Sequence, residues 1–253
     1  MDLPPELLDE IISYIPPHDE RLLRNCSLVA NSWVYPSRRR IFKAVDIWRN
    51  PRLELWLDAI SPTNVEILQH VRSLTFNLAD APDSPRPSAD LINYLPSFIQ
   101  LECLTLQSGS VPVFTQIDTY SAFQHTLLYL SLRCCHVAAS ALVTIVDYFP
   151  NLAHLELADP SHMVDGQPAL PFSRPLQKLT FTELYTDSGL AFLDQLMVLR
   201  PQCDEVTIGR HEASCPSLAQ SVVNGVEACV KRLRLESMLS CAFSVPKRCG
   251  DDL

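Results

Sequence analysis

The chain has 253 residues, of which 47% are apolar and 19% are charged, a composition that permits a sizeable core and argues against a disordered chain. No apolar stretch is long enough to span a bilayer, and the N-terminus lacks a signal-type segment, so we expect a cytoplasmic or nuclear protein without a membrane partner. Nine cysteines without a C-x-x-C pair are typical of reduced, packed thiols.

The net charge of −9 is unevenly distributed. Residues 1–50 hold seven basic and seven acidic side chains, whereas residues 51–253 hold 13 basic and 22 acidic ones. An acidic region lacks the basic stripe that nucleic-acid binding requires, so we expect no nucleic-acid partner. The charge favours a neutral or basic protein partner instead.

Three short helices are predicted near the N-terminus. The first covers residues 3–15, where apolar residues recur at helical spacing and prolines stand at the start. Asp19 is expected to cap the second helix. The third segment covers about residues 32–42, and because it contains Pro36 we expect regular helix to begin only there.

These three helices carry more apolar side chains than a unit of about 45 residues can bury. A domain of that size is marginal by itself. The surplus predicts either a surface for a partner or a cap on the region that follows, since terminal units of repeat proteins commonly have that role. The physical argument favours neither alternative.

The N-terminal segment contains, in order, Leu3-Pro4-Pro5-Glu6-Leu7-Leu8, Ile11-Ile12, Cys26-Ser27-Leu28-Val29 and Trp33. In these residues and their spacing it resembles an F-box, most closely the F-box-like proteins of mushroom-forming fungi. The resemblance implies docking on a Skp-family adaptor of a cullin-type ubiquitin ligase. The positions that would make or support the docking surface are Leu3, Pro4, Leu7, Leu8, Ile11, Ile12, Leu23, Leu28 and Val29. Trp33 is expected in the helical core.

Strands are predicted at regular intervals from residue 44 onward, with Ala44–Ile47 as the first. An apolar-x-x-apolar-x-apolar pattern then recurs seven times, beginning at Val71, Leu101, Leu127, Leu152, Leu176, Cys203 and Val230. A period of 24 to 30 residues indicates a solenoid of stacked repeats. Helix-like segments ending near prolines at 89–95, 140–149 and 188–199 predict crossovers between parallel strands.

At these residues the chain resembles the leucine-rich-repeat family over about residues 70–236. The predicted fold class is therefore α/β, with a three-helix F-box at 1–43 and a solenoid of seven to eight rungs at 44–253, an irregular horseshoe with its parallel sheet on the concave side. Irregular curvature is expected because only Cys135 fits the family's Asn/Cys position. The alternative is an ordinary α/β sheet with leucine-rich strands.

No catalytic constellation is present in the sequence. There is neither a glycine-rich phosphate loop nor a nucleophile elbow. The segment His211–Cys215 lacks the second histidine of a zinc-protease helix, and Cys134-Cys135-His136 is better explained by core packing. We therefore expect a protein that is not an enzyme and that has no cofactor or metal.

The outward-facing strand residues are the expected binding surface, because a few aromatic, histidine and charged side chains usually dominate recognition. The residues predicted to bind a substrate are Tyr129, Arg133, His154, Glu156, Arg232 and Arg234. The predicted function is a substrate-recognition adaptor of a ubiquitin ligase that is monomeric outside its complex. The alternative is a non-enzymatic repeat scaffold for protein–protein interaction without a ligase role.

Overall fold

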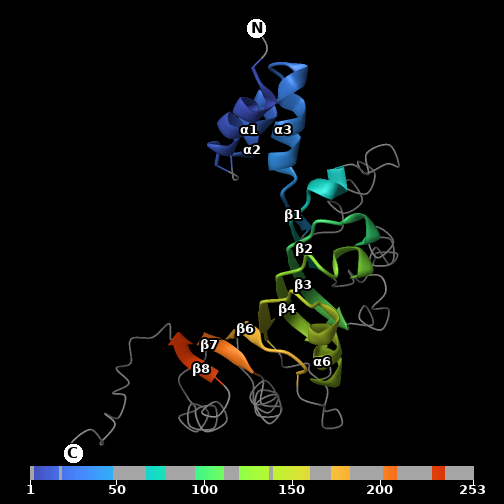
Figure 1. The fold of residues 1–253 in the computed structure, drawn as a ribbon, viewed down its shortest axis with the longest axis vertical. Coiled ribbons are helices and arrows are strands. Elements are labelled where there is room, and N and C mark those ends of the chain that lie inside the picture. Colours follow the sequence, from blue (N-terminus) through green and yellow to red (C-terminus); the bar gives the residue numbers. More distant parts are fainter. Residues whose placement is uncertain are drawn as a thin grey trace, which may run out of the picture.

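The fold is an arc of parallel strands that begins with a small helical unit (Figure 1). A computed structural model describes residues 3–16, 19–47, 67–77, 95–110, 120–136, 139–159, 172–182, 202–209 and 230–236. Within these residues the strands form one eight-stranded sheet, and each strand pairs in parallel with the next strand in the sequence. The strands follow the inner side of the arc and α6 lies on its outer side (Figure 1). The predicted order of a helical unit followed by a solenoid is confirmed.

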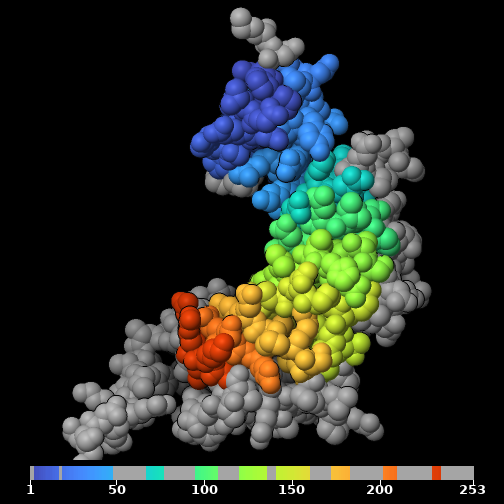
Figure 2. Space-filling model, viewed as in Figure 1, coloured from blue at the N-terminus to red at the C-terminus, as the bar shows by residue number. Residues whose placement is uncertain are grey.

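The helical unit forms a separate lobe at one end of the arc, drawn in blue in Figure 2. Its helices are α1 (Pro5–Ser13), α2 (Glu20–Cys26) and α3 (Asn31–Ile41). Asp19 caps α2 as predicted, since its carboxylate Oδ1 accepts a hydrogen bond from the backbone N–H of Leu22 at 3.0 Å. Trp33, which was expected in the core, is only partly buried.

The predicted start of the third helix at Pro36 is wrong. The helix α3 begins at Asn31 and continues through Pro36. A proline at this position removes only the hydrogen bond that its N–H would have made to the carbonyl of Ser32, one turn earlier. Pro36 is buried, and the burial of its apolar ring offsets the lost bond.

The sheet consists of the strands β1 (Ala44–Ile47), β2 (Ser73–Asn77), β3 (Cys103–Ser110), β4 (Tyr129–His136), β5 (His154–Ala158), β6 (Leu176–Thr182), β7 (Cys203–Gly209) and β8 (Val230–Glu236). The register aligns the inward leucines of successive rungs, so Leu104, Leu130, Leu155 and Leu179 lie side by side. Each of these four side chains is fully buried. The repeat pattern therefore builds one continuous hydrophobic core, as its period predicts.

The rungs of β2 to β6 bend near the start of the strand, so apolar residues of opposite parity in the sequence pattern can both be buried. Leu101 and Leu104 are both buried although an unbroken strand would point them to opposite faces. At the bend one carbonyl of the preceding rung accepts two successive N–H groups: the carbonyl of Arg72 accepts from Glu102 and Cys103 at 2.8 Å each. The carbonyls of Lys43, Glu102, Leu128 and Ala153 accept a pair of hydrogen bonds in the same way.

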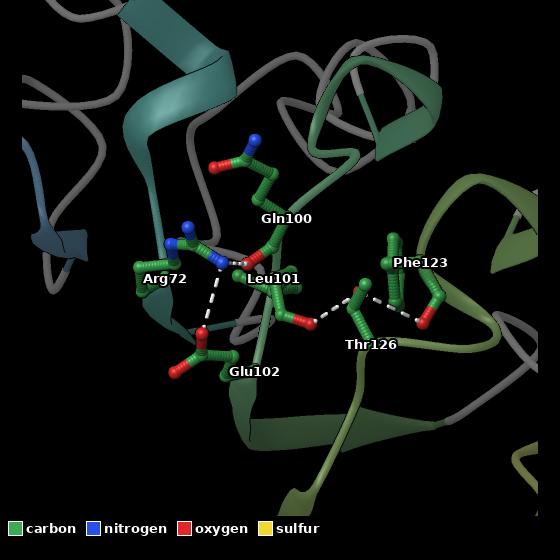
Figure 3. A network of polar contacts seen from close by, with 6 residues as sticks. All are labelled: Arg72, Gln100, Leu101, Glu102, Phe123 and Thr126. Carbon is green, nitrogen blue, oxygen red and sulfur yellow. Dashed lines mark hydrogen bonds and ion pairs between the residues drawn. The ribbon is translucent and has the colours of Figure 1, made fainter. Parts of the chain in front are cut away.

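Side chains also link neighbouring rungs, as Figure 3 shows for the rungs of β2 to β4. Arg72 Nη1 donates to Glu102 Oε1 at 2.9 Å and to the carbonyl of Gln100 at 3.4 Å. Thr126 Oγ1 donates to the carbonyl of Leu101 at 2.8 Å. These bonds satisfy loop carbonyls that regular pairing leaves over.

The outer side of the arc is helical where the structure describes it. The helix α6 (Ala139–Tyr148) confirms the crossover predicted at 140–149. The carbonyls at its C-terminal end accept hydrogen bonds from the Arg174 guanidinium, which reaches back from the next rung to Val146 and Phe149. A short 3₁₀ turn, η2 (Leu95–Ser97), lies at the end of the helix-like segment predicted at 89–95. The residues 89–94 and the whole predicted segment 188–199 lie outside the described residues.

Cys135, at the predicted Asn/Cys position, is buried against the preceding rung. Its side chain is 1% exposed, and Sγ lies 3.5 Å from the carbonyl of Leu106 in the rung before. Burial raises the pKa of the Cys135 thiol to about 12, so it stays a neutral S–H donor. Packing of Cys135 in the core is confirmed, whereas the His136 side chain lies outside the described ones.

Candidate docking face and concave surface

The helical unit has apolar side chains on two faces of α1. Leu8 and Ile12 are 2% exposed and close the small core together with Leu23. Leu7 and Ile11, one turn apart on the other face, remain 45% and 41% exposed. A surface helix normally presents polar groups on that side, so α1 has an apolar face that the described residues leave uncovered.

The helical unit has more exposed apolar groups outside α1. Leu3 precedes α1, and Leu28 and Val29 follow α2 with exposed fractions of 83% and 67%. We use the name apolar docking face for the exposed members of the predicted adaptor-binding set: Leu3, Pro4, Leu7, Ile11, Leu28 and Val29. Several exposed apolar groups on one small domain are candidates for an interaction site.

The other three predicted adaptor-binding residues lie in the core. Leu8, Ile12 and Leu23 are buried, so a partner cannot contact them in this conformation and they can only support the docking face. Tyr14 and Leu22 are exposed apolar residues that the prediction missed. For Tyr14 a signal existed, because it continues the spacing of Leu7 and Ile11 along the same helix.

On the concave surface, the parallel register aligns outward side chains into rows. One row runs across β3 to β8 through Cys103, Tyr129, His154, Lys178, Glu205 and Arg232. The next row runs through Thr105, Ser131, Glu156, Thr180, Thr207 and Arg234. Neighbours in a row are close enough to interact directly, although 24 to 27 residues separate them in the sequence.

Four predicted substrate-binding residues meet at β4 and β5, and we call Tyr129, Arg133, His154 and Glu156 the central cluster. Arg133 Nη2 forms an ion pair with Glu156 Oε1 at 3.0 Å, and the Tyr129 hydroxyl donates to Glu156 Oε2. The Tyr129 ring stands edge-on to the His154 imidazole, with centroids 4.7 Å apart. His154 Nε2 lies 2.8 Å from Thr180 Oγ1.

The central cluster has a balanced charge at neutral pH. Glu156 is only 8% exposed, and its carboxylate is matched by the Arg133 guanidinium. Burial, together with the hydrogen bond to Glu156, raises the pKa of Tyr129 to about 12. Burial and the nearby Lys178 ammonium lower the pKa of His154, so the imidazole stays neutral. The cluster therefore offers a rigid set of donors and acceptors without net charge.

Replacing Glu156 with glutamine is expected to lower the pKa of Tyr129 toward its usual value of about 10, because the change removes the negative charge beside the phenol. In the wild type, the raised pKa of Tyr129 makes its full contribution to stability at pH values below about 10. This contribution is lost as the pH rises toward 12. Tyrosinate absorbance during an alkaline titration measures the shift, with circular dichroism confirming that the chain stays folded. Asp204→Asn, at an exposed carboxylate paired with Lys231, is the control. Superimposable titrations of wild type and E156Q would contradict the assignment.

Arg232 and Arg234, the other two predicted substrate-binding residues, do not join the central cluster. They are exposed on β8, and β6 and β7 separate them from it. Between the two groups, Lys178 Nζ lies 3.2 Å from Glu205 Oε1, and hydrogen bonding to Lys178 lowers the pKa of the Glu205 carboxyl. Sequence reasoning placed these two residues on the outward face but did not choose them.

The described ranges contain no group of three histidine, cysteine or carboxylate side chains placed to hold a metal. The segment His211–Cys215 lies outside these ranges. Among the described helices, none combines the length and apolar character needed to cross a membrane.

Comparison with protein families gives one result for this chain. The family model of the F-box domain matches residues 1–34, which include α1, α2 and the first turn of α3. The chain thus carries an F-box domain at its N-terminal end, followed by a parallel β-solenoid. No curated protein matches the chain.

Proposed function

We propose, from the F-box domain at residues 1–34, that this chain is a non-enzymatic substrate receptor of a cullin-type ubiquitin ligase. F-box proteins are typically adaptors without catalysis, and the domain implies binding to a Skp-family adaptor. In this proposal residues 1–43 dock on the adaptor and residues 44–253 hold a protein substrate. The proposal extends to a leucine-rich-repeat solenoid of the kind attached to F-boxes in mushroom-forming fungi. The 24- to 30-residue period and the Cys135 bond to the preceding rung support it.

The observation that carries the adaptor role is the apolar docking face. The three helices already close a core with Leu8, Ile12 and Leu23, so the apolar groups that remain outside are not needed for folding. Fully burying a leucine or isoleucine side chain gives roughly 1.5–3 kcal/mol. Because association costs about 4–15 kcal/mol, an adaptor must cover most of the face to bind.

The concave surface supports the second half of the proposal. The central cluster is pre-organised, since each of its side chains has a partner and Glu156 is nearly buried. Pre-organised side chains lose little conformational entropy on binding, which favours affinity. We propose that substrate contacts Tyr129, Arg133, His154 and Glu156, with Arg232 and Arg234 as a separate cationic contact.

Binding of the purified chain to a Skp-family adaptor tests the adaptor role. We expect wild type to retain the adaptor in a pull-down and Leu3→Ala/Pro4→Ala to lose it, because both residues belong to the apolar docking face. Ile99→Ala, at an exposed apolar residue of the solenoid, is the control and should bind as wild type does. Absence of binding by the wild-type chain would refute the proposal.

The scaffold alternative is favoured by the direct connection of α3 to β1. The carbonyl of Lys43, two residues after α3, accepts the N–H groups of Arg72 and Ser73 and so ties the helical unit to the first rungs. If the helices only cap the solenoid, deletion of residues 1–40 will destabilise the repeats without removing any bound partner. Loss of adaptor binding with the solenoid intact would exclude this alternative.

A further inference from the structure

A polar cleft of about 330 Å³ lies where the F-box helices meet the first rungs of the solenoid. Its walls come from α1, α3 and the bends that precede β2 and β3. We call it the junction cleft, and it is lined by Asp9, Ile12, Ser13, Pro36, Arg39, Arg40, Lys43, His70, Arg72 and Glu102. None of its residues belongs to the central cluster, and only the buried Ile12 belongs to the predicted adaptor-binding set.

The junction cleft is positively charged in an otherwise acidic protein. Four cationic side chains face two carboxylates, which leaves a net charge of +2 without counting His70, whereas the whole chain carries −9. Arg72 and Glu102 compensate each other at 2.9 Å. Arg39 and Asp9 lie 3.6 Å apart and are both about half exposed, so their ion pair is weak.

Two of the cations have no carboxylate partner among the residues that the structure describes. Arg40 Nη2 donates to the carbonyls of Ser13 and Ile15 at the end of α1, which holds the guanidinium in place but leaves its charge uncancelled. Lys43 forms no ion pair within the described residues. A bound anion would therefore meet a fixed arginine and an available lysine, and it would compete with Asp9 for Arg39.

We propose that the junction cleft binds a phosphate monoester. Such a group carries a charge of about −1.5 to −2 at neutral pH and three acceptor oxygens, which matches the charge of the cleft, whereas a carboxylate supplies a single charge. One arginine guanidinium can donate two parallel N–H bonds to two oxygens of a phosphate. In the junction cleft, Lys43, which has no ion pair among the described residues, and Arg39, which has a weak one, are available for such contacts. The volume is at the lower limit of small-molecule sites, about 300 Å³, so it admits the phosphate with a small organic group attached.

Calorimetric titration of the full chain with O-phosphoserine tests this site, with serine and inorganic phosphate as parallel probes. We expect phosphoserine to bind and serine not to bind. Arg39→Gln/Lys43→Gln should weaken phosphoserine binding about tenfold or more, because it removes two charge-assisted contacts. Arg24→Gln/Lys231→Gln, which removes the same charge at two exposed sites away from the cleft, should leave binding unchanged.

A variant with the opposite expected effect guards against misfolding. Asp9→Asn releases Arg39 and removes a negative charge, so it should tighten phosphoserine binding about threefold, which corresponds to a weak exposed ion pair. Stronger binding of phosphoserine than of inorganic phosphate would assign the site to an attached phosphate, and equal binding would assign it to the free ion. Equal affinity in the cleft variant, the remote variant and wild type, or no phosphoserine binding at millimolar concentration, would overturn the proposal. Neither result bears on adaptor docking, which uses other residues.

Discussion

Leu155→Ala is expected to lower the free energy of unfolding by about 3–4 kcal/mol. Leu155 is fully buried in β5 and lies between Leu130 of β4 and Leu179 of β6. Truncation leaves a cavity at the middle of the core, and rigid strands on both sides limit how far the site can collapse. Because stability in a solenoid depends on contacts between neighbouring rungs, one cavity weakens two interfaces. Urea denaturation followed by circular dichroism measures the loss.

Leu128→Ala is the matched control for this prediction. It removes the same atoms one rung earlier, but Leu128, the residue before β4, is 45% exposed. We expect a loss of less than about 1 kcal/mol, as is usual for surface positions. Similar losses for the two variants would show that the inward leucines do not form the continuous core on which the solenoid depends.

Leu7→Ala/Ile11→Ala is expected to weaken binding to a Skp-family adaptor roughly 100-fold or more. Fully burying a leucine or isoleucine side chain is worth roughly 1.5–3 kcal/mol, so losing two of them removes about 3 kcal/mol, a factor of roughly 100. Leu7 and Ile11 lie side by side on α1, and neither contributes to the buried core of the helical unit. Surface plasmon resonance with immobilised adaptor measures the change, and we expect it mainly in the dissociation rate.

The corresponding control is Ile99→Ala/Leu128→Ala. It removes the same number of apolar atoms from side chains of similar exposure, but on the solenoid. We expect adaptor affinity to stay within about twofold of wild type and both double variants to unfold at similar urea concentrations. Equal loss of affinity in both would mean that adaptor binding does not depend on the apolar docking face.

The sequence predicted much of the architecture because the relevant signals are local. A rung is specified within six residues, so the place of every strand from β2 onward follows from the apolar pattern, although β2 to β5 begin two residues after its first position and β6 to β8 begin at it. Asp19 at the start of α2 and the helix before Pro150 are equally local signals. Pro36 was misread because the cost of one lost hydrogen bond was weighed without the packing that offsets it.

The candidate sites could be predicted only in part, because their geometry depends on lateral neighbours. Outward positions follow from strand parity, but whether Glu156 meets Arg133 or Thr180 depends on the exact register between β4, β5 and β6. The junction cleft could not be predicted from the sequence, because Asp9, Lys43 and Glu102 belong to separate elements that only the tertiary fold brings together.

By itself the sequence determined the periodicity, the parallel order of the strands and the resemblance of residues 1–34 to an F-box, because each rests on residues close together in the chain. Only the tertiary structure decided which apolar residues of α1 are buried and which remain exposed. A helix with apolar side chains on two faces does not specify which one turns inward, and contact with α3 made that choice. Packing thus separated Leu8 and Ile12, which hold the helices together, from Leu7 and Ile11, which are left for a partner.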